Sequence, residues 1–260
     1  MKISIIVTTY NRPEALAAVL EGLRRQTEPP GEVIVADDGS GPETAGTVRE
    51  AAGRMPWPLS HVWQEDRGFR ASAIRNRAIL ACTGSYIVLL DGDCIPDRHF
   101  VGDHRALAQP GFFFQGRRVL VGKGMAGRFT ASQANAGRLR LFFAREIENA
   151  HHLIRLPWFP ALTTTRMGGI RSCNMGFFRG DIFAVNGFNA DFTGWGREDS
   201  ELALRFYRLG LKRKDHPFRA VCFHLWHPEN PREGLERNET LLRDAMASED
   251  YECKNGLVQK

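Results

Sequence analysis

The sequence predicts an α/β fold in which helices flank a mostly parallel sheet. Short, almost wholly apolar runs alternate with helical periodicity through the first hundred residues, and polar clusters follow several of these runs. Runs of this kind are typical of parallel strands that are buried on both faces. A length of 260 residues with 43% hydrophobic residues suits one large domain or two small ones.

The first strand is expected at residues 3–7, and the helix after it has one apolar face, formed by Leu16, Val19, Leu20 and Leu23. Pro13 and Glu14 suit the first turn of that helix. Further strands and helices then alternate, with strands at 33–36, 59–64 and 86–90 and helices at 43–52 and 71–81. This β-α-β-α-β-α-β order predicts a mostly parallel sheet with right-handed crossovers.

The middle of the chain has weaker patterns. It predicts strands at 112–114 and 119–121, one helix over 137–156 that ends before Pro157, and a loop over 163–169. The patterns then sharpen, and they predict helices at 181–185, 198–209 and 235–247 and a strand at 220–225.

Composition excludes several classes of protein. The five cysteines are scattered and never have C-x-x-C spacing, which argues against a disulfide framework or a structural zinc site and favours buried thiols. The longest strongly apolar run, residues 86–90, is too short to cross a bilayer, and no secretory signal opens the chain. We therefore expect a cytoplasmic protein, at most bound to the inner face of a membrane. A net charge of +5 suits phosphate-bearing ligands or an anionic membrane, and does not by itself indicate nucleic acid.

Polar residues follow three of the predicted strands, in the clusters Thr8-Thr9-Tyr10, Asp37-Asp38 and Asp91-Gly92-Asp93. Ligands bind such sheets outside the carboxyl ends of their strands, so these clusters are expected to line one rim. Asp91 and Asp93 have the spacing to hold Mg²⁺ or Mn²⁺ and so bridge to a diphosphate; the alternative is a solvated acidic turn. Asp38 can accept a hydrogen bond from the N3–H of uracil, or it belongs to a simple Asx turn.

Arg70 and Arg75 lie around the start of a helix, where they could hold a diphosphate. Arg77 is better explained as part of a solvated basic face. Near the C-terminus, His224 and His227 lie at a strand end, where one of them could complete a metal site; we favour His224, with His227 as the alternative.

The run Gly194-Trp195-Gly196-Arg197-Glu198-Asp199 is the most distinctive motif. Two glycines allow a sharp turn around an aromatic wall, and two carboxylates then stand in the first turn of a helix. One of these carboxylates is expected to be ionised at neutral pH and to serve as a general base. The alternative is simple complementation of the helix dipole.

Residues 122–127 read G-x-G-x-x-G after a strand-like run, which is formally a dinucleotide fingerprint. The motif lies outside the first β-α unit, and no clear βαβ unit follows it. We therefore favour a glycine hinge or an active-site lid.

Four segments together resemble glycosyltransferase family 2, which has the Rossmann-like GT-A nucleotide-sugar fold. These segments are residues 5–12, 35–40, 73–76 and 90–93, and they follow the family's order and spacing. Residues 194–227 resemble the catalytic region of galactosyltransferases and chondroitin-type polymerases. The resemblance implies a GT-A domain over residues 1–230, made of a nucleotide-binding half (1–97), a variable or lid region (98–170) and an acceptor and catalytic half (171–230), with a helical tail at 231–260.

The resemblance also implies roles. Uridine is expected to contact Thr8, Tyr10 and Asp38. The rest of the nucleotide is expected to contact Arg70 or Arg75. The ribose or sugar is expected at Asp91, whereas Mn²⁺ or Mg²⁺ is expected at Asp93 and His224, with Asp91 and His227 as alternative ligands. The expected catalytic residues are Asp199, as the base, and Glu198, which also binds substrate beside Trp195 and Gly196.

The implied activity is metal-dependent, inverting transfer of a hexose from a UDP-sugar to a saccharide or glycolipid acceptor. Two other functions are kept, a non-catalytic module that binds nucleotide sugars and an oxidoreductase that uses residues 122–127. The segment from Leu139 to Trp158 is rich in arginine and aromatic residues. It is interpreted as a packed helix, a lid, an acceptor groove or a contact with anionic membrane.

Overall fold

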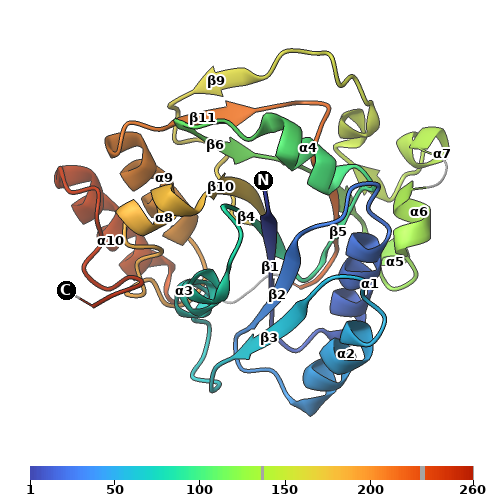
Figure 1. Cartoon of the computed structure of the whole chain (residues 1–260), viewed down its shortest axis with the longest axis horizontal. Coiled ribbons are helices and arrows are strands. Elements are labelled where there is room, and N and C mark those ends of the chain that lie inside the picture. Colours follow the sequence, from blue (N-terminus) through green and yellow to red (C-terminus); the bar gives the residue numbers. More distant parts are fainter. Residues whose placement is uncertain (136–137, 229–231, 260) are drawn as a thin grey trace.

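The computed structural model describes residues 1–135, 138–228 and 232–259. Its first part alternates strands and helices as the sequence predicts (Figure 1): β1 (Ile3–Thr9), α1 (Pro13–Arg24), β2 (Glu32–Asp37), α2 (Pro42–Ala52), β3 (Leu59–Trp63), α3 (Ala71–Ala81) and β4 (Tyr86–Asp91). These four strands are parallel neighbours in the order β3-β2-β1-β4. The predicted fold class is confirmed.

The same large sheet continues beyond β4 with four strands from the rest of the chain, in the order β10 (Asn174–Phe178), β6 (Phe112–Gln115), β11 (Lys212–Asp215) and β9 (Leu162–Thr164). Strand β10 runs antiparallel to β4 and therefore brings the second half of the chain against the first. A smaller sheet contains β5 (Cys94–Pro96), β12 (Val221–Leu225), β7 (Arg117–Val121) and β8 (Ile147–Glu148). Helix α4 (Phe100–Leu107) connects β5 to β6.

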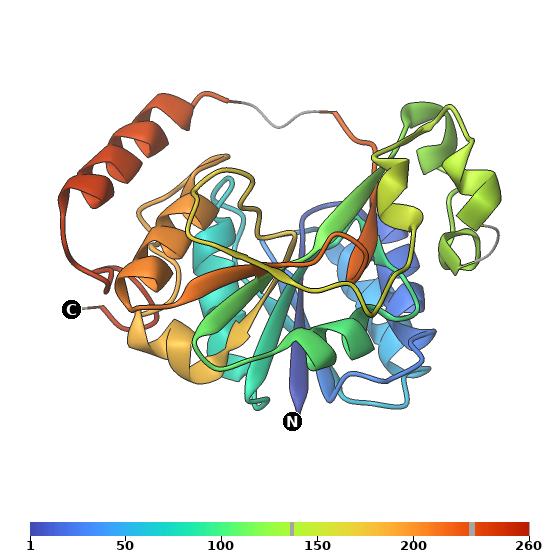
Figure 2. The same cartoon turned by 90° about the horizontal axis from the view of Figure 1, so that it is seen from above.

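Helices cover both faces of the large sheet (Figure 2), and alternate residues of β1 face different layers. Ile5 packs in one apolar core with α1 and α2, whereas Ile6 packs in another with α3, α8 (Arg179–Ala184) and α9 (Glu198–Arg208). Both side chains are fully buried, which explains why β1 is an almost continuous apolar run. Helix α10 (Leu235–Ala247), with the bounds that the sequence predicts, lies against α9.

The predicted single helix over 137–156 is wrong. After α5 (Lys123–Ala126), this region forms α6 (Ala131–Asn135), α7 (Arg138–Phe142), β8 and a 3₁₀ turn at Ala150–Leu153. Its buried apolar residues Leu141, Ile147 and Leu153 are six residues apart, a spacing that places them on different sides of an α-helix. Gly137 and the predicted domain boundary at residues 230–231 lie outside the described residues.

Two further strands escape the sequence patterns. Strand β9 occupies the start of the predicted loop at 163–169, and β11 follows α9 with the charged sequence Lys-Arg-Lys-Asp. In the described parts of the chain, all five cysteines are free and buried, as expected. No described helix has the length and apolarity that a membrane crossing needs.

Candidate active site

The strand register gathers the predicted polar clusters at one edge of the large sheet. Thr8 of β1 lies opposite Asp91 of β4 on one side and Ala36 of β2 on the other, and Thr9 lies opposite Asp37. Since parallel strands end at the same edge, side chains far apart in sequence meet there. The expected convergence of the three clusters is confirmed.

Arg75 of α3 lies at the centre of this edge. Its guanidinium donates hydrogen bonds to Thr8 Oγ1 at 3.3 Å, Asp91 Oδ1 at 3.4 Å and Glu198 Oε1 at 3.0 Å. The Arg75 side chain is only 5% exposed, so its charge depends on these partners for compensation. Arg75 therefore joins the two halves of the chain in a single site.

Asp38 lies buried just beyond β2, with both carboxylate oxygens in use. Oδ2 accepts a hydrogen bond from the backbone N–H of Arg70 at 2.7 Å, and Oδ1 accepts one from Gln64 Nε2 at 2.5 Å. Burial raises the pKa of Asp38, and the Arg70 and Gln64 donors oppose that rise. The guanidinium of Arg70 is directed elsewhere, toward the carbonyl oxygen of Glu65.

Tyr10 is 46% exposed, and its hydroxyl donates a hydrogen bond to Asp66 Oδ2 at 2.8 Å. Hydrogen bonding to Asp66 and burial raise the pKa of this phenol. Its ring is therefore held in place by Asp66 and remains open to a ligand.

A second cluster lies on the turn after β4. Asp93 lies 3.3 Å from Nε2 of His227 and 3.7 Å from Nε2 of His224, and the three candidate ligand atoms all lie within 4.8 Å of one another. Burial lowers the pKa of His224 to about 4, so its imidazole is neutral at pH 7, the form that binds metal. Both histidines therefore lie beside Asp93, so the favoured His224 and the alternative His227 are both candidate metal ligands.

These residues fit a divalent metal ion. A carboxylate with two imidazoles suits a transition ion such as Mn²⁺ better than Mg²⁺, which prefers oxygen ligands. Arg12 Nη1 lies 2.6 Å from Asp93 Oδ2 and supplies positive charge at this carboxylate. The sequence analysis gave Arg12 no role, although this residue lies two positions after the cluster Thr8-Thr9-Tyr10.

The Gly-Trp-Gly loop brings α9 to the same site. Gly194 and Gly196 have positive φ angles of 75° and 103°, which glycine adopts without strain, and Arg197 follows at 78°. Trp195 is 40% exposed on this loop, with the Arg232 guanidinium 5.4 Å from its ring centre. The loop therefore presents Trp195 outward and directs the first turn of α9 toward Arg75.

Asp199 lies in that first turn, beside Glu198. Burial, reinforced by the charge of Glu198, raises the pKa of Asp199 from its ordinary 3.8 to about 7. This corrects the expectation that the carboxylate is fully ionised at neutral pH. A pKa near neutrality is well matched to proton transfer under physiological conditions.

Helix α10 fixes the Gly-Trp-Gly loop, which the sequence analysis did not predict. Asn238 is fully buried, and its Nδ2 donates hydrogen bonds to the carbonyl oxygens of Thr193 at 3.1 Å and Gly196 at 2.9 Å. A single asparagine in a charged helix carries no sequence signal of such a contact.

Glu146 of the same chain fills the space beside the glycine-rich run at 122–127. Gly122 donates its N–H to the carbonyl oxygen of Glu146 at 2.7 Å, and Gly124 donates to the Glu146 carboxylate at 3.0 Å. A Cβ atom on Gly122 would lie 2.4 Å from that carboxylate. These glycines therefore accommodate Glu146, and the helix α5 that begins within the run has only four residues, too short for a dinucleotide site.

The site combines two parts of the chain. Aspartates lie at the carboxyl edge of the parallel strands, and the second half of the chain adds Glu198, Asp199 and two histidines. This arrangement defines a GT-A transferase. The chain belongs to glycosyltransferase family 2, whose model matches residues 4–177. A second model, described as the N-terminal domain of galactosyltransferase, matches residues 162–228.

Similar proteins agree with this assignment. Validoxylamine A glucosyltransferase of Streptomyces hygroscopicus subsp. limoneus is 29% identical over 226 residues, which cover 80% of this chain and 48% of the relative. Chondroitin synthase of Escherichia coli is 28% identical over 236 residues, covering 80% of this chain and 32% of the synthase. The chain thus spans half or less of the length of these two relatives.

Solved structures confirm the fold. A structure of residues 1–349 of TarS from S. aureus superposes with a TM-score of 0.67 at 15% identity, over 95% of this chain and 66% of that fragment. The mannosyltransferase PcManGT of Pyrobaculum calidifontis, in complex with GDP-Man and Mn²⁺, has a TM-score of 0.58 at 21% identity, over 93% of this chain and 60% of PcManGT.

Proposed function

We propose that this chain transfers a hexose of the galactose, glucose or N-acetylhexosamine type from a UDP-sugar to a saccharide or glycolipid acceptor, with inversion and with Mn²⁺ or Mg²⁺. The observation that carries the proposal is the contact of Arg75 with both Asp91 and Glu198. This contact supports the proposal because it joins the residue proposed for the donor, Asp91, to the residue proposed for the acceptor, Glu198. A TarS structure in complex with UDP-GlcNAc supports a UDP-sugar donor by analogy.

On the donor side, Asp38 is the proposed acceptor for the uracil N3–H, because each of its oxygens keeps a free lone pair beyond the bond that it already accepts. The exposed ring of Tyr10 is a surface on which the base can stack. Asp91, which accepts a hydrogen bond from Arg75 Nη2, is proposed to bind the ribose or sugar hydroxyls, and the neighbouring Thr8 accepts a hydrogen bond from Nε of the same guanidinium. Arg75 is thus a positioning residue for the nucleotide site.

Asp93, His224 and His227 are the proposed ligands of the metal ion. When bound, the ion neutralises the charge that develops on the departing diphosphate, a Lewis-acid contribution of several kcal/mol. Arg12 lies at the same carboxylate and can turn toward a phosphate oxygen.

On the acceptor side, Asp199 is the proposed base that accepts the proton of the attacking hydroxyl. Its pKa of about 7 leaves a large share of the carboxylate ionised at neutral pH while keeping it basic enough to accept a proton. Glu198, held by Arg75, is proposed to bind a sugar hydroxyl, and Trp195 with Gly196 to form the wall beside it. Since the base acts on the acceptor directly, no covalent enzyme intermediate is required.

The test is turnover of a panel of UDP-sugars and GDP-sugars with saccharide acceptors, in Mn²⁺, in Mg²⁺ and after EDTA. We expect UDP release that depends on one UDP-sugar, on an acceptor and on metal. Binding of UDP without turnover of any sugar would instead favour the non-catalytic module. Saturable binding of NAD would favour the oxidoreductase, which the contact of Glu146 with Gly122 and Gly124 argues against.

We further propose that residues 139–158 contact an anionic membrane. The segment projects at one edge of the molecule (Figure 2), and three of its apolar side chains, Leu139, Phe143 and Trp158, are 74–78% exposed. Arginines 140 and 145 lie among them. Aromatic and basic residues together are typical of membrane-surface segments. Flotation with anionic and neutral liposomes tests this, and failure to float with anionic liposomes would refute it.

A further inference from the structure

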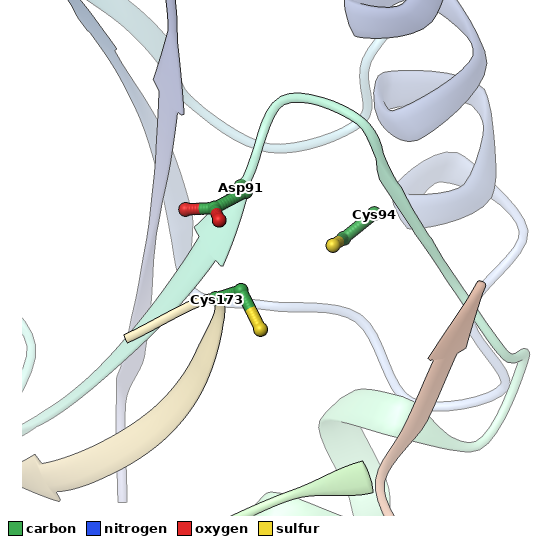
Figure 3. Close-up of side chains that lie close together, drawn as sticks. All are labelled: Asp91, Cys94 and Cys173. Carbon is green, nitrogen blue, oxygen red and sulfur yellow. The ribbon is translucent and has the colours of Figure 1, made fainter. Parts of the chain in front are cut away.

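Three of the five cysteines lie together beside the Asp91-Gly92-Asp93 turn. Cys94, Cys173 and Cys222 are each at most 5% exposed, and the Cys94 thiol makes hydrogen-bond contact with both of the others. Figure 3 shows the Cys94 side chain directed back toward Asp91 and Cys173. The spacing of these residues in the sequence, 79 and 49 residues apart, gives no sign of such a cluster.

The two sheets assemble this cluster from three separate segments. In the smaller sheet, Cys94 lies opposite His224, so Cys222, two residues earlier in β12, faces the same side. In the large sheet, Asn174 of β10 lies opposite Leu90, and the preceding Cys173 therefore reaches the level of Asp91. The cluster is thus built by strand pairing, which makes its geometry reproducible.

Distances among Asp91, Cys94 and Cys173 suit a single ion, and Cys222 reaches this group through its contact with Cys94. The ligand atoms of Asp91, Cys94 and Cys173 all lie within 4.8 Å of one another. Tetrahedral zinc with Zn–S bonds of about 2.3 Å holds its sulfurs about 3.8 Å apart, so small side-chain rotations suffice. The carboxylate of Asp91 is 34% exposed and gives an ion a route from the active-site edge.

A positive charge beside the cluster favours the thiolate form of its ligands. Arg118 lies opposite Cys222 in the smaller sheet and interacts with the thiol of Cys173. Its positive charge offsets part of the negative charge that three thiolates and a carboxylate bring to a divalent ion. The Cys222 sulfur also accepts a hydrogen bond from Asn174 Nδ2 at 3.7 Å, as metal-bound sulfurs commonly do.

We propose that Cys94, Cys173 and Cys222, together with Asp91, form a second metal site, selective for thiophilic divalent ions such as Zn²⁺ or Cd²⁺. It differs from the site at Asp93, His224 and His227 because soft thiolates select d¹⁰ ions, whereas carboxylate and imidazole suit Mn²⁺. Each thiol that binds loses its proton to solvent as the sulfur–metal bond forms, and no oxidation or reduction takes place.

The test uses Cd²⁺ alone as the probe, because each cadmium–thiolate bond adds ultraviolet charge-transfer absorption. Titration of the whole chain is expected to saturate at one tightly bound Cd²⁺ per chain and to release about three protons per ion in weak buffer. The double variant Cys82→Ala/Cys253→Ala keeps only the three clustered cysteines. It is expected to give the full absorption band, and loss of the band in this variant would overturn the proposal.

Cys94→Ala is expected to reduce the band by a third or more and to weaken Cd²⁺ binding at least tenfold, while Asp93→Asn, with an altered Mn²⁺ site, keeps the band. Absence of the band in the unaltered chain, or a band that Cys94→Ala leaves unchanged, would sink the inference. Thermal unfolding without metal checks that each variant is folded. If Cys94→Ala does not fold, the absorption band of the double variant Cys82→Ala/Cys253→Ala decides the test.

A consequence for activity rests on the proposed function. An ion bound to Asp91 competes with Arg75 and with the donor for that carboxylate. Zn²⁺ is therefore expected to inhibit transfer in the presence of Mn²⁺. The cadmium band needs no donor, so a failure of the proposed function and a failure of the thiolate site give different results.

Discussion

Arg75 Nη1 donates a hydrogen bond to Glu198 Oε1 at 3.0 Å, although 123 residues separate them in the sequence. The bond crosses from α3, in the parallel part of the sheet, to the first turn of α9. Because the same guanidinium also binds Asp91, a shift of either helix would change the positions of both carboxylates. The proposed donor side and the proposed acceptor side are therefore coupled through a single buried cation, Arg75.

Replacement of that cation should disable both sides. Arg75→Met leaves the carboxylates of Asp91 and Glu198 without their shared partner, and breaking a buried ion pair in this way costs roughly 3–5 kcal/mol. We expect kcat/KM to fall at least 100-fold and UDP affinity to fall as well. Arg77→Ala, an exposed arginine on the same helix, is the matched control and should leave both unchanged. Normal UDP binding and turnover in Arg75→Met would show that Arg75 is not needed to position the carboxylates of Asp91 and Glu198.

The proposed role of Asp199 as the base predicts a specific pH profile. With a pKa of about 7, kcat/KM should rise with pH through neutrality as the carboxylate loses its proton. Asp199→Asn should lower kcat about 10²–10⁴-fold, remove that rise and keep UDP binding. The comparison is a pH series from 5 to 9 with saturating metal. A profile in the unaltered enzyme that is flat across this range would refute the assignment.

The same pKa has a consequence for stability. The folded state holds the Asp199 proton more tightly than the unfolded state, whose pKa is near the ordinary 3.8. Stability from this group is therefore present below about pH 4 and is lost as pH rises toward 7. Asp199→Asn should be more stable than the parent at pH 8 and similar to it at pH 4. Each kcal/mol corresponds to about 2–4 °C in melting temperature for a domain approaching this size. An Asn variant that melts lower at pH 8 would contradict the burial argument.

The sequence was sufficient for the parallel sheet because β1, β2 and β4 are buried on both faces and read as apolar runs. The pattern also predicted that Thr8 and Asp91 lie at one edge of the sheet, because the carboxyl ends of parallel strands meet at the same edge. The prediction from sequence failed where pairing with neighbouring strands, and not the periodicity of apolar residues, decides the secondary structure. Strand β11 is a charged Lys-Arg-Lys-Asp segment with no apolar alternation, and it is a strand because β6 and β9 flank it. The Cys94 cluster depends on such pairings, which composition does not record.

The proposed metal cluster predicts a loss of metal affinity on removal of any of its three ligands. Asp93→Asn, His224→Ala and His227→Ala should each raise the Mn²⁺ concentration needed for half-maximal activity by about 10-fold or more. His99→Ala, away from the cluster in the loop before α4, is the control. Activity that persists unchanged in EDTA would remove the metal from the reaction altogether.

Arg12 predicts the opposite effect on metal affinity. Its guanidinium neutralises Asp93 at 2.6 Å, and an arriving cation must replace it there. Arg12→Ala should therefore bind Mn²⁺ several-fold more tightly in calorimetric titration without donor. If Arg12 then turns to the donor phosphates, the same variant should have a raised KM for the UDP-sugar. Weaker Mn²⁺ binding by Arg12→Ala would show that the arginine supports the metal site and does not compete with it.

The contact of α10 with the Gly-Trp-Gly loop gives the last prediction. The Asn238 amide satisfies the carbonyl oxygens of Thr193 and Gly196, so Asn238→Ala leaves two acceptors unpaired next to Trp195. An unsatisfied buried acceptor costs about 1–3 kcal/mol, an upper limit for these half-buried carbonyls, and we expect a lower melting temperature with a raised KM for the saccharide acceptor. Thr240→Ala, exposed on the same helix, should change neither. Because the loop bears on the acceptor side, UDP affinity should stay within about twofold in Asn238→Ala; an equal loss of UDP and acceptor binding would mean that α10 supports the whole fold and not this loop.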